Sequence, residues 1–141
     1  MTADEATLAW SLLRRAAATT VSRVNDELLE RRGMPLHAVE VMAALHAARH
    51  PVAMTQLAAQ LHLHKSTVTR SVDQLEADGL VEREISQQDG RVQLARLTRQ
   101  GRDVYRRLLP AYQRAIRRNF SKWLTETDVA ALLRALGKVA D

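Results

Sequence analysis

Apolar residues recur at helical spacing over most of the chain. Between residues 8 and 29 they follow one another at intervals of three and four, which predicts a long amphipathic helix ending near Gly33. A second helix is expected over residues 35–49, with Pro35 at its first position, where proline is favoured. Pro51 closes that stretch.

The next part of the chain predicts two short helices joined by a tight turn. The first is expected over residues 56–61 with Thr55 as its N-cap, and the second over residues 65–78. Gly79 suits the left-handed position that follows a helix. Two short helices with such a connection are the helix-turn-helix pattern.

Beyond Gly79 the pattern changes to that of strands. Residues 80–85 and 91–97 predict two strands, the second with Val92 and Leu94 on one face, and Asp89-Gly90 between them is a strong hairpin signal.

Two helices complete the predicted elements. Thr98 is expected to cap a helix of about twenty residues, bent near Pro110, and the last helix is expected over residues 125–139. The chain should therefore form one domain, mainly α with a small β-hairpin.

Composition narrows the class of partner and of chemistry. The 141 residues carry 21 Lys+Arg against 16 Asp+Glu, a net charge of +5, and only three of the cations are lysines, which is a weak sign of a polyanionic partner. The absence of cysteine excludes disulfides and thiolate chemistry. No signal sequence and no apolar run of about 20 residues is present, so a cytoplasmic protein without membrane contact is expected.

The helix over residues 65–78 has two different faces on a helical wheel. The inward face carries Val68, Val72 and Leu75. The outward face and its flanks carry Ser66, Thr67, Thr69, Arg70, Asp73, Gln74 and Ala77. Hydroxyls and an arginine near a helix N-terminus suit contacts to DNA bases in the major groove, although a solvated structural face would show the same residues. Asp73 follows Arg70 by three residues, so the two could pair, and direct acceptance from a cytosine amine is the less favoured alternative.

Arg91 lies just beyond the predicted hairpin tip. An arginine there is well placed to enter a narrow minor groove, although an ordinary exposed loop arginine is the alternative. The outward face and the hairpin arginine together are more specific for DNA binding than either alone.

Nearly the whole chain resembles the MarR family of winged-helix transcription regulators. The resemblance is densest in TQLAAQL, STVTRSVDQLEADGLVER, the segment DGR and LTRQG. It implies a winged helix-turn-helix unit over residues 34–98 with dimerisation helices in residues 1–33 and 99–141. It further implies a homodimer on a pseudo-palindromic operator, usually a repressor released by a small ligand.

The resemblance also assigns roles to individual residues. Base and phosphate contacts map onto Ser66, Thr67, Thr69 and Arg70, and DNA-backbone contacts onto Gln56 and Lys65. The minor-groove contact maps onto Arg91, with Asp89 and Arg83 bracing the hairpin. The chain departs from the family at His64, where a serine N-cap is common, and His64 can still touch a phosphate. It also departs at Met34-Pro35, where the second helix often begins with a Leu-Thr pair.

The helices at both ends predict a dimer. Residues 55–97 form a small DNA-reading unit, which cannot cover all the apolar residues of these helices. The residues that need a partner surface are Trp10, Leu13, Phe120, Trp123, Leu124 and Leu132. Two chains are expected to interlock here, the alternative being that the helices fold back on their own chain.

An effector, a metal and an enzyme activity remain to be weighed. By the resemblance, an organic effector, for which an anionic aromatic compound is one candidate, would lie between the dimerisation helices and the DNA-reading unit. Its lining would be Trp10, Arg14, His37, His46, Tyr105 and Tyr112, although core packing explains each of these aromatics too. His46 and His50 have a zinc-compatible spacing, but a third ligand is not evident, so no metal and no cofactor is predicted. An enzyme is not expected, because no phosphate loop, thiol or carboxylate pair is present. Two alternatives remain: a DNA-binding regulator that responds to zinc held by histidines, and a helical protein-interaction module without specific DNA binding.

Overall fold

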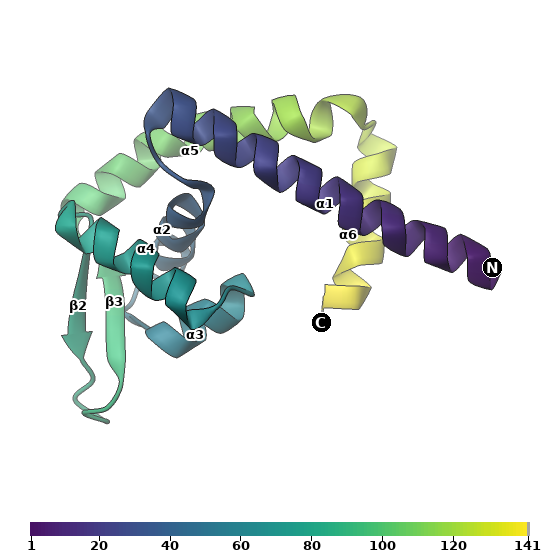
Figure 1. Cartoon of the computed structure of the whole chain (residues 1–141). Helices are drawn as coiled ribbons and strands as arrows, with labels where there is room; N and C mark the ends of the chain where they lie inside the picture. Colours follow the sequence, from purple (N-terminus) through teal and green to yellow (C-terminus); the bar gives the residue numbers. More distant parts are fainter. Residues whose placement is uncertain (141) are drawn as a thin grey trace.

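The computed structural model describes residues 1–140, which form a mainly helical molecule with one small sheet (Figure 1). The elements in chain order are α1 (Ala3–Arg32), α2 (Leu36–Ala48), β1 (Val52–Ala53), α3 (Met54–Leu61), α4 (Lys65–Ala77), β2 (Val81–Ile85), β3 (Gln93–Leu97), α5 (Arg99–Asn119), the 3-10 helix η1 (Ser121–Trp123) and α6 (Glu126–Ala140). The predicted mainly α fold with a β-hairpin is confirmed.

Most helix ends follow the residues that predict them. Gly33 ends α1 in the left-handed region, with φ 64°, and Gly79 has φ 76° after α4. The Thr98 hydroxyl accepts a hydrogen bond from the backbone N–H of Gly101 at 2.9 Å, so Thr98 caps α5 as predicted. Pro110 lies inside α5, which continues through it.

The predicted start of the third helix is wrong. Thr55 lies inside α3, whose N-cap is Ala53 and has no side-chain hydrogen bond. The reason is a strand that the sequence pattern did not predict: Val52 and Ala53 form β1, which pairs with β3, and the chain passes directly from it into α3. Pro35 likewise serves as the N-cap of α2 and not as its first helical residue.

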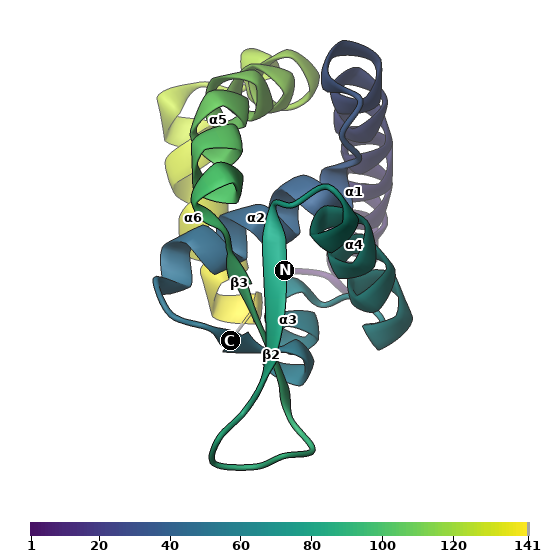
Figure 2. The same cartoon turned by 90° about the vertical axis from the view of Figure 1, so that its left-hand side faces the viewer.

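The three strands form an antiparallel sheet in the order β1-β3-β2. Asp89-Gly90 does not form a two-residue hairpin turn: residues 86–92 make a wider loop, in which the Ser86 N–H donates to the Val92 carbonyl oxygen at 2.9 Å. Gly90 does not have the positive φ that a tight primed turn requires. Figure 2 shows this loop extending beyond the helices, and we call β2, β3 and the loop the wing.

The main hydrophobic core lies between α2, α3, α4, the start of α5 and the sheet. Its fully covered side chains include Met42, Leu57, Val68, Val72 and Val81. A second, smaller cluster lies where α1, α2 and α5 meet, and consists of Val24, Leu28, Leu36, Val39 and Ala115.

The terminal helices are covered far less. Helix α1 buries only Val24 and Leu28 along its 30 residues, and α6 buries none. Large apolar side chains stay exposed on these helices and η1, among them Leu8, Trp10, Leu12, Leu13, Val21, Phe120, Trp123, Leu133, Leu136 and Val139. Over residues 1–140, none of the helices combines the length and the apolar character that crossing a membrane requires.

Helix α5 is joined closely to the chain segment that leaves α4. A Cβ added to Gly101 would lie 1.9 Å from the carbonyl oxygen of Leu80, so only glycine fits there. That same oxygen accepts a hydrogen bond from the N–H of Thr98, and the Thr98 hydroxyl donates to the Gly79 carbonyl oxygen at 2.7 Å. These contacts join residues 79–80 to residues 98–101.

Candidate nucleic-acid interface

Helix α4 has the two faces that its sequence predicts. Val68, Val72 and Leu75 are at most 1% exposed and pack into the main core. On the other side Ser66, Thr69 and Arg70 are exposed, and Thr67 is half-buried. Their side chains are free to contact a ligand, because none of the four makes a hydrogen bond or ion pair to another residue within 1–140.

The N-terminus of α4 also presents free backbone donors. His64 is the N-cap residue and its side chain makes no capping hydrogen bond. The first backbone bond into the helix runs from the Val68 N–H to the His64 carbonyl oxygen at 3.1 Å, which leaves the preceding amides pointing outward. Uncapped amides and the positive end of the helix dipole together attract a phosphate. His64 and Lys65 are exposed beside them, as is Gln56 on α3.

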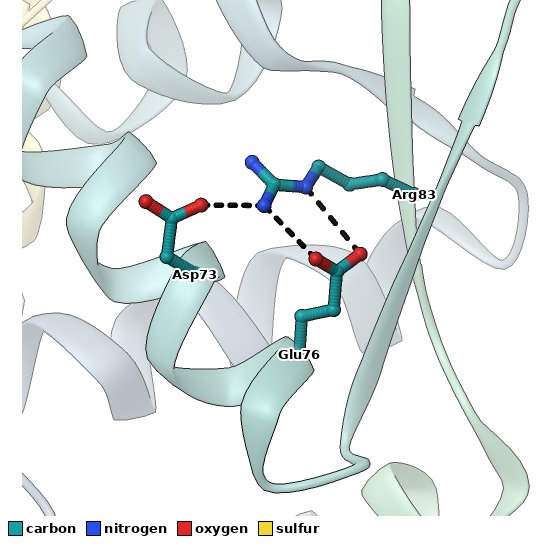
Figure 3. A network of polar contacts seen from close by, with 3 residues as sticks. All are labelled: Asp73, Glu76 and Arg83. Carbon is teal, nitrogen blue, oxygen red and sulfur yellow. Dashed lines mark hydrogen bonds and ion pairs between the residues drawn. The ribbon is translucent and has the colours of Figure 1, made fainter.

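Arg83 on β2 reaches across to α4 (Figure 3). Its guanidinium donates to both Asp73 and Glu76, with Nη2 at 3.0 Å and Nε at 3.5 Å from the Glu76 carboxylate oxygens. The hydrogen bond from Arg83 holds the pKa of Glu76 below its usual value, and Glu76 in turn raises the pKa of Arg83. Arg83 therefore joins the wing to α4.

This ion pair changes the predicted role of two residues. Asp73 does not pair with Arg70, because its carboxylate points toward Arg83 instead. Arg83 braces the wing through α4 and not together with Asp89. Sequence reasoning missed Glu76, although its spacing from Asp73 places two carboxylates on one side of α4 next to the strand that carries Arg83.

The wing loop holds Arg91 outward. Its side chain is 91% exposed. The Asp89 carboxylate accepts from the Arg91 backbone N–H at 3.0 Å and from its Nε at 3.3 Å, so Asp89 orients both the loop and the side chain. The hydroxyl of Ser86 accepts from the N–H groups of Gln88 and Asp89, which closes the base of the loop.

The six residues predicted to line an effector pocket fall into separate groups within one chain. The rings of His46 and Tyr105 lie 4.8 Å apart. His37 Nδ1 lies 3.9 Å from the Glu40 carboxylate and is buried without a hydrogen-bond partner among residues 1–140. Burial raises the pKa of Tyr112, and the nearby Glu40 adds to this effect.

Trp10 and Arg14 lie apart from the other four. The Arg14 guanidinium lies 5.8 Å from the centre of the Trp10 ring, and both line a shallow hollow on exposed α1.

The described part of the chain offers no metal site. Within residues 1–140 no three His, Asp or Glu side chains come close enough to hold an ion. His46 and His50 both line one cleft, where Nδ1 of His50 lies 2.9 Å from the Pro51 carbonyl oxygen.

Comparison with known proteins identifies a family and several solved structures with this fold. The sequence model of the MarR family matches residues 32–92. Sco3205, a MarR family transcriptional regulator from Streptomyces coelicolor solved in complex with DNA, is 30% identical, with 99% of this chain and 88% of that chain covered and a TM-score of 0.83. No match is found among curated protein sequences.

Two further solved structures share the fold. A MarR family regulator from Silicibacter pomeroyi is 30% identical over 93% of this chain and 86% of that chain, with a TM-score of 0.73. The E. coli MarR mutant complexed with operator DNA is 23% identical over 98% and 97%, with a TM-score of 0.80. The family match and the DNA-bound relative identify the chain as a DNA-binding transcriptional regulator and not an enzyme. The chain belongs to the MarR family.

Proposed function

We propose that this chain is a repressor that binds a pseudo-palindromic operator as a homodimer and is released by a small ligand. The observation that carries DNA reading is the pairing of an uncapped α4 N-terminus, flanked by free hydroxyls and Arg70, with an outward arginine at the wing tip. The relative Sco3205, which was solved with DNA bound, supports the same use of this fold.

In the proposed complex the N-terminal turns of α4 enter the major groove. Ser66, Thr67, Thr69 and Arg70 contact bases and phosphates, while Gln56, His64 and Lys65 contact the DNA backbone. Arg91 enters the adjacent minor groove, where a narrow A·T-rich tract attracts an arginine. The Arg83 bridge keeps α4 and the wing at a fixed separation, so both grooves are met at once.

The dimer in this proposal is formed by residues 1–33 and 99–141. The exposed apolar side chains of α1, η1 and α6 make a surface that a single chain leaves in water. Covering it with the same surface of a second chain gives two-fold symmetry and sets two α4 helices about one DNA turn, roughly 34 Å, apart.

Arg70→Ala and Arg91→Ala test the reading of DNA. A preferred duplex is first selected from a random pool, and binding is then followed by fluorescence anisotropy. We expect Arg70→Ala to cost about 1–3 kcal/mol and to relax sequence preference, if Arg70 reads a base. Arg91→Ala should weaken binding chiefly where the flanks are A·T-rich.

Arg107→Ala is the matched control, because it removes the same charge from an exposed position on α5. It should leave sequence preference unchanged. An equal loss of affinity on all duplexes for Arg70→Ala and Arg91→Ala would show that neither residue reads DNA. Repression and its release are tested with a reporter under the selected operator and a panel of aromatic acids, and failure of every acid to release the operator would argue against them as effectors.

A further inference from the structure

A basic cleft lies where the end of α2, the end of β3 and the start of α5 meet. It has a volume of about 550 Å³ and is lined by His46, Arg49, His50, Arg96, Arg102 and Arg106, with Leu45, Pro51 and Leu97 as its apolar part. None of the nine lining residues is acidic, although the chain carries 16 Asp and Glu. A cleft of this size is in the range that holds a small organic molecule.

Two of the four arginines in this cleft form exposed ion pairs with carboxylates outside it. Arg96 pairs with Glu82 across the strands at 2.7 Å, and Arg106 pairs with Asp103 at 3.4 Å, and neither carboxylate lines the cleft. Arg49 and Arg102 have no carboxylate partner anywhere in residues 1–140. Both line the same cleft, so an anion that binds the two guanidinium groups lowers the electrostatic energy of the site.

The backbone fixes the side chain of Arg102 and the left-handed turn that carries Arg49. Nη1 of Arg102 donates to the Leu97 carbonyl oxygen at 3.2 Å, which fixes its guanidinium beside the end of β3. Arg49 ends α2 in the left-handed region, with φ 57°, where glycine would cost less. Guanidinium groups hold carboxylate and phosphate oxygens through paired, charge-assisted hydrogen bonds.

The position of the cleft separates it from the DNA-reading surface. Strand β3 runs from the wing loop to α5, so Arg96 and Arg102 lie at the opposite end of the wing from Arg91. Helix α4 packs on β2, whereas the cleft lies beside β3 and the segment leading to β1. Figure 2 shows α4 and the end of α2 that leads into β1 on opposite sides of the wing.

We propose that this cleft binds a small anion carrying at least two carboxylate or phosphate groups. One anionic group lies between Arg49 and Arg102, and Arg96 and Arg106 receive the other. The site is distinct from the effector lining expected from the sequence, with which it shares only His46, and it does not depend on DNA binding.

Isothermal titration of the whole protein with citrate and with pyrophosphate tests the proposal and separates the two anion chemistries. We expect saturable binding of at least one probe, at one site per chain, with sodium chloride at equal ionic strength giving none. Amide NMR signals should shift in residues 45–51 and 96–106. Arg102→Gln should weaken binding by about tenfold or more, since a charged hydrogen-bonding partner is lost.

Two variants keep the result decisive. Arg49→Gln removes a guanidinium that has no hydrogen bond of its own, so it carries the test if loss of the Leu97 contact unfolds Arg102→Gln. Arg107→Gln on the same helix as Arg102 removes equal charge outside the cleft and should bind the probe normally. Equal weakening in all three variants, or no saturable binding of either probe, overturns the proposal. One further result would overturn the proposal: Arg49→Gln lowers the affinity for the operator and its salt dependence, while no anion binds the protein. The cleft would then be a contact for the DNA backbone.

Discussion

The reading unit and the terminal helices place the same kinds of residue in opposite environments. Val72 on α4 and Leu133 on α6 both belong to apolar stripes with helical spacing, yet Val72 is 0% exposed and Leu133 is 73% exposed. The buried residues of the main core all lie within 38–108, whereas α6 buries no residue. Apolar spacing therefore identifies which face of a helix has to be covered, and it does not identify which chain covers it.

The largest effect is expected from a cavity in the reading unit. Leu57 is fully buried, and Leu57→Ala should lower the free energy of unfolding by about 2–5 kcal/mol, since the methyl groups are lost and a void remains. Urea unfolding measures this change. The dimer dissociation constant, followed by sedimentation under folding conditions, should stay the same; a shift in that constant would mean that the two regions are not separate.

The second largest effect is expected at Gly101, where α5 meets the DNA-reading unit and no side chain fits. Gly101→Ala should cost about 1–3 kcal/mol or more, because its Cβ would overlap the Leu80 carbonyl oxygen and force α5 away from the reading unit. Gly137→Ala on α6 is the matched control, since an added Cβ meets nothing there and should stabilise the helix by up to about 1 kcal/mol. Similar melting temperatures for the two variants would contradict the close approach.

A smaller and different effect is expected at the terminal helices. Trp123 is 60% exposed, and Trp123→Ala should weaken the proposed dimer by about 1–3 kcal/mol if the indole packs against the partner. A dilution series by analytical ultracentrifugation gives the dissociation constant. Wild-type protein that stays monomeric at micromolar concentration would show that these helices meet no second copy.

The smallest effect concerns the Arg83 bridge and depends on pH. The pKa of Glu76 in the folded protein is lowered from 4.5 by the hydrogen bond from Arg83, so its contribution to stability is present above that value and is lost as pH falls through the folded-state pKa. Glu76→Gln should therefore flatten the fall in stability on acidification, measured by urea unfolding between about pH 3 and pH 7. Glu84→Gln removes equal charge from β2 and serves as control; an identical pH profile in both variants would contradict the bridge.

Helices with long apolar stripes could be predicted from the sequence, because their pattern is local. The core face of α4, the cap at Thr98 and the glycines after α1 and α4 all follow from neighbouring residues. Strand β1 could not be predicted, since its two residues carry no periodicity and it exists only by pairing with Ala95 and Leu94, more than 40 positions away. The error at Thr55 follows from that missing strand.

The candidate site divides in the same way. The outward positions of Ser66, Thr69 and Arg70 come from helical geometry alone and were predictable. The partners of Arg83 could not be predicted, because several carboxylates lie within ten positions of it in the sequence. Only the packing of α4 on the strand selects Asp73 and Glu76. The basic cleft could not be predicted from the sequence either, because its arginines come from three separate elements that only the fold brings together.

Helix α5 connects the DNA-reading unit to the C-terminal helices. Its 21 residues span about 31 Å at 1.5 Å per residue, with one end fixed at Leu80 through Gly101 and the other among the apolar side chains of η1. A tilt of roughly 10° about its far end displaces the DNA-reading unit by about 5 Å. This displacement is a sizeable fraction of a half-turn of DNA, over which a major groove that faces the protein turns away from it. In the proposed homodimer, a modest change in how the two copies sit together would therefore be enough to bring α4 into register with the operator or to take it out.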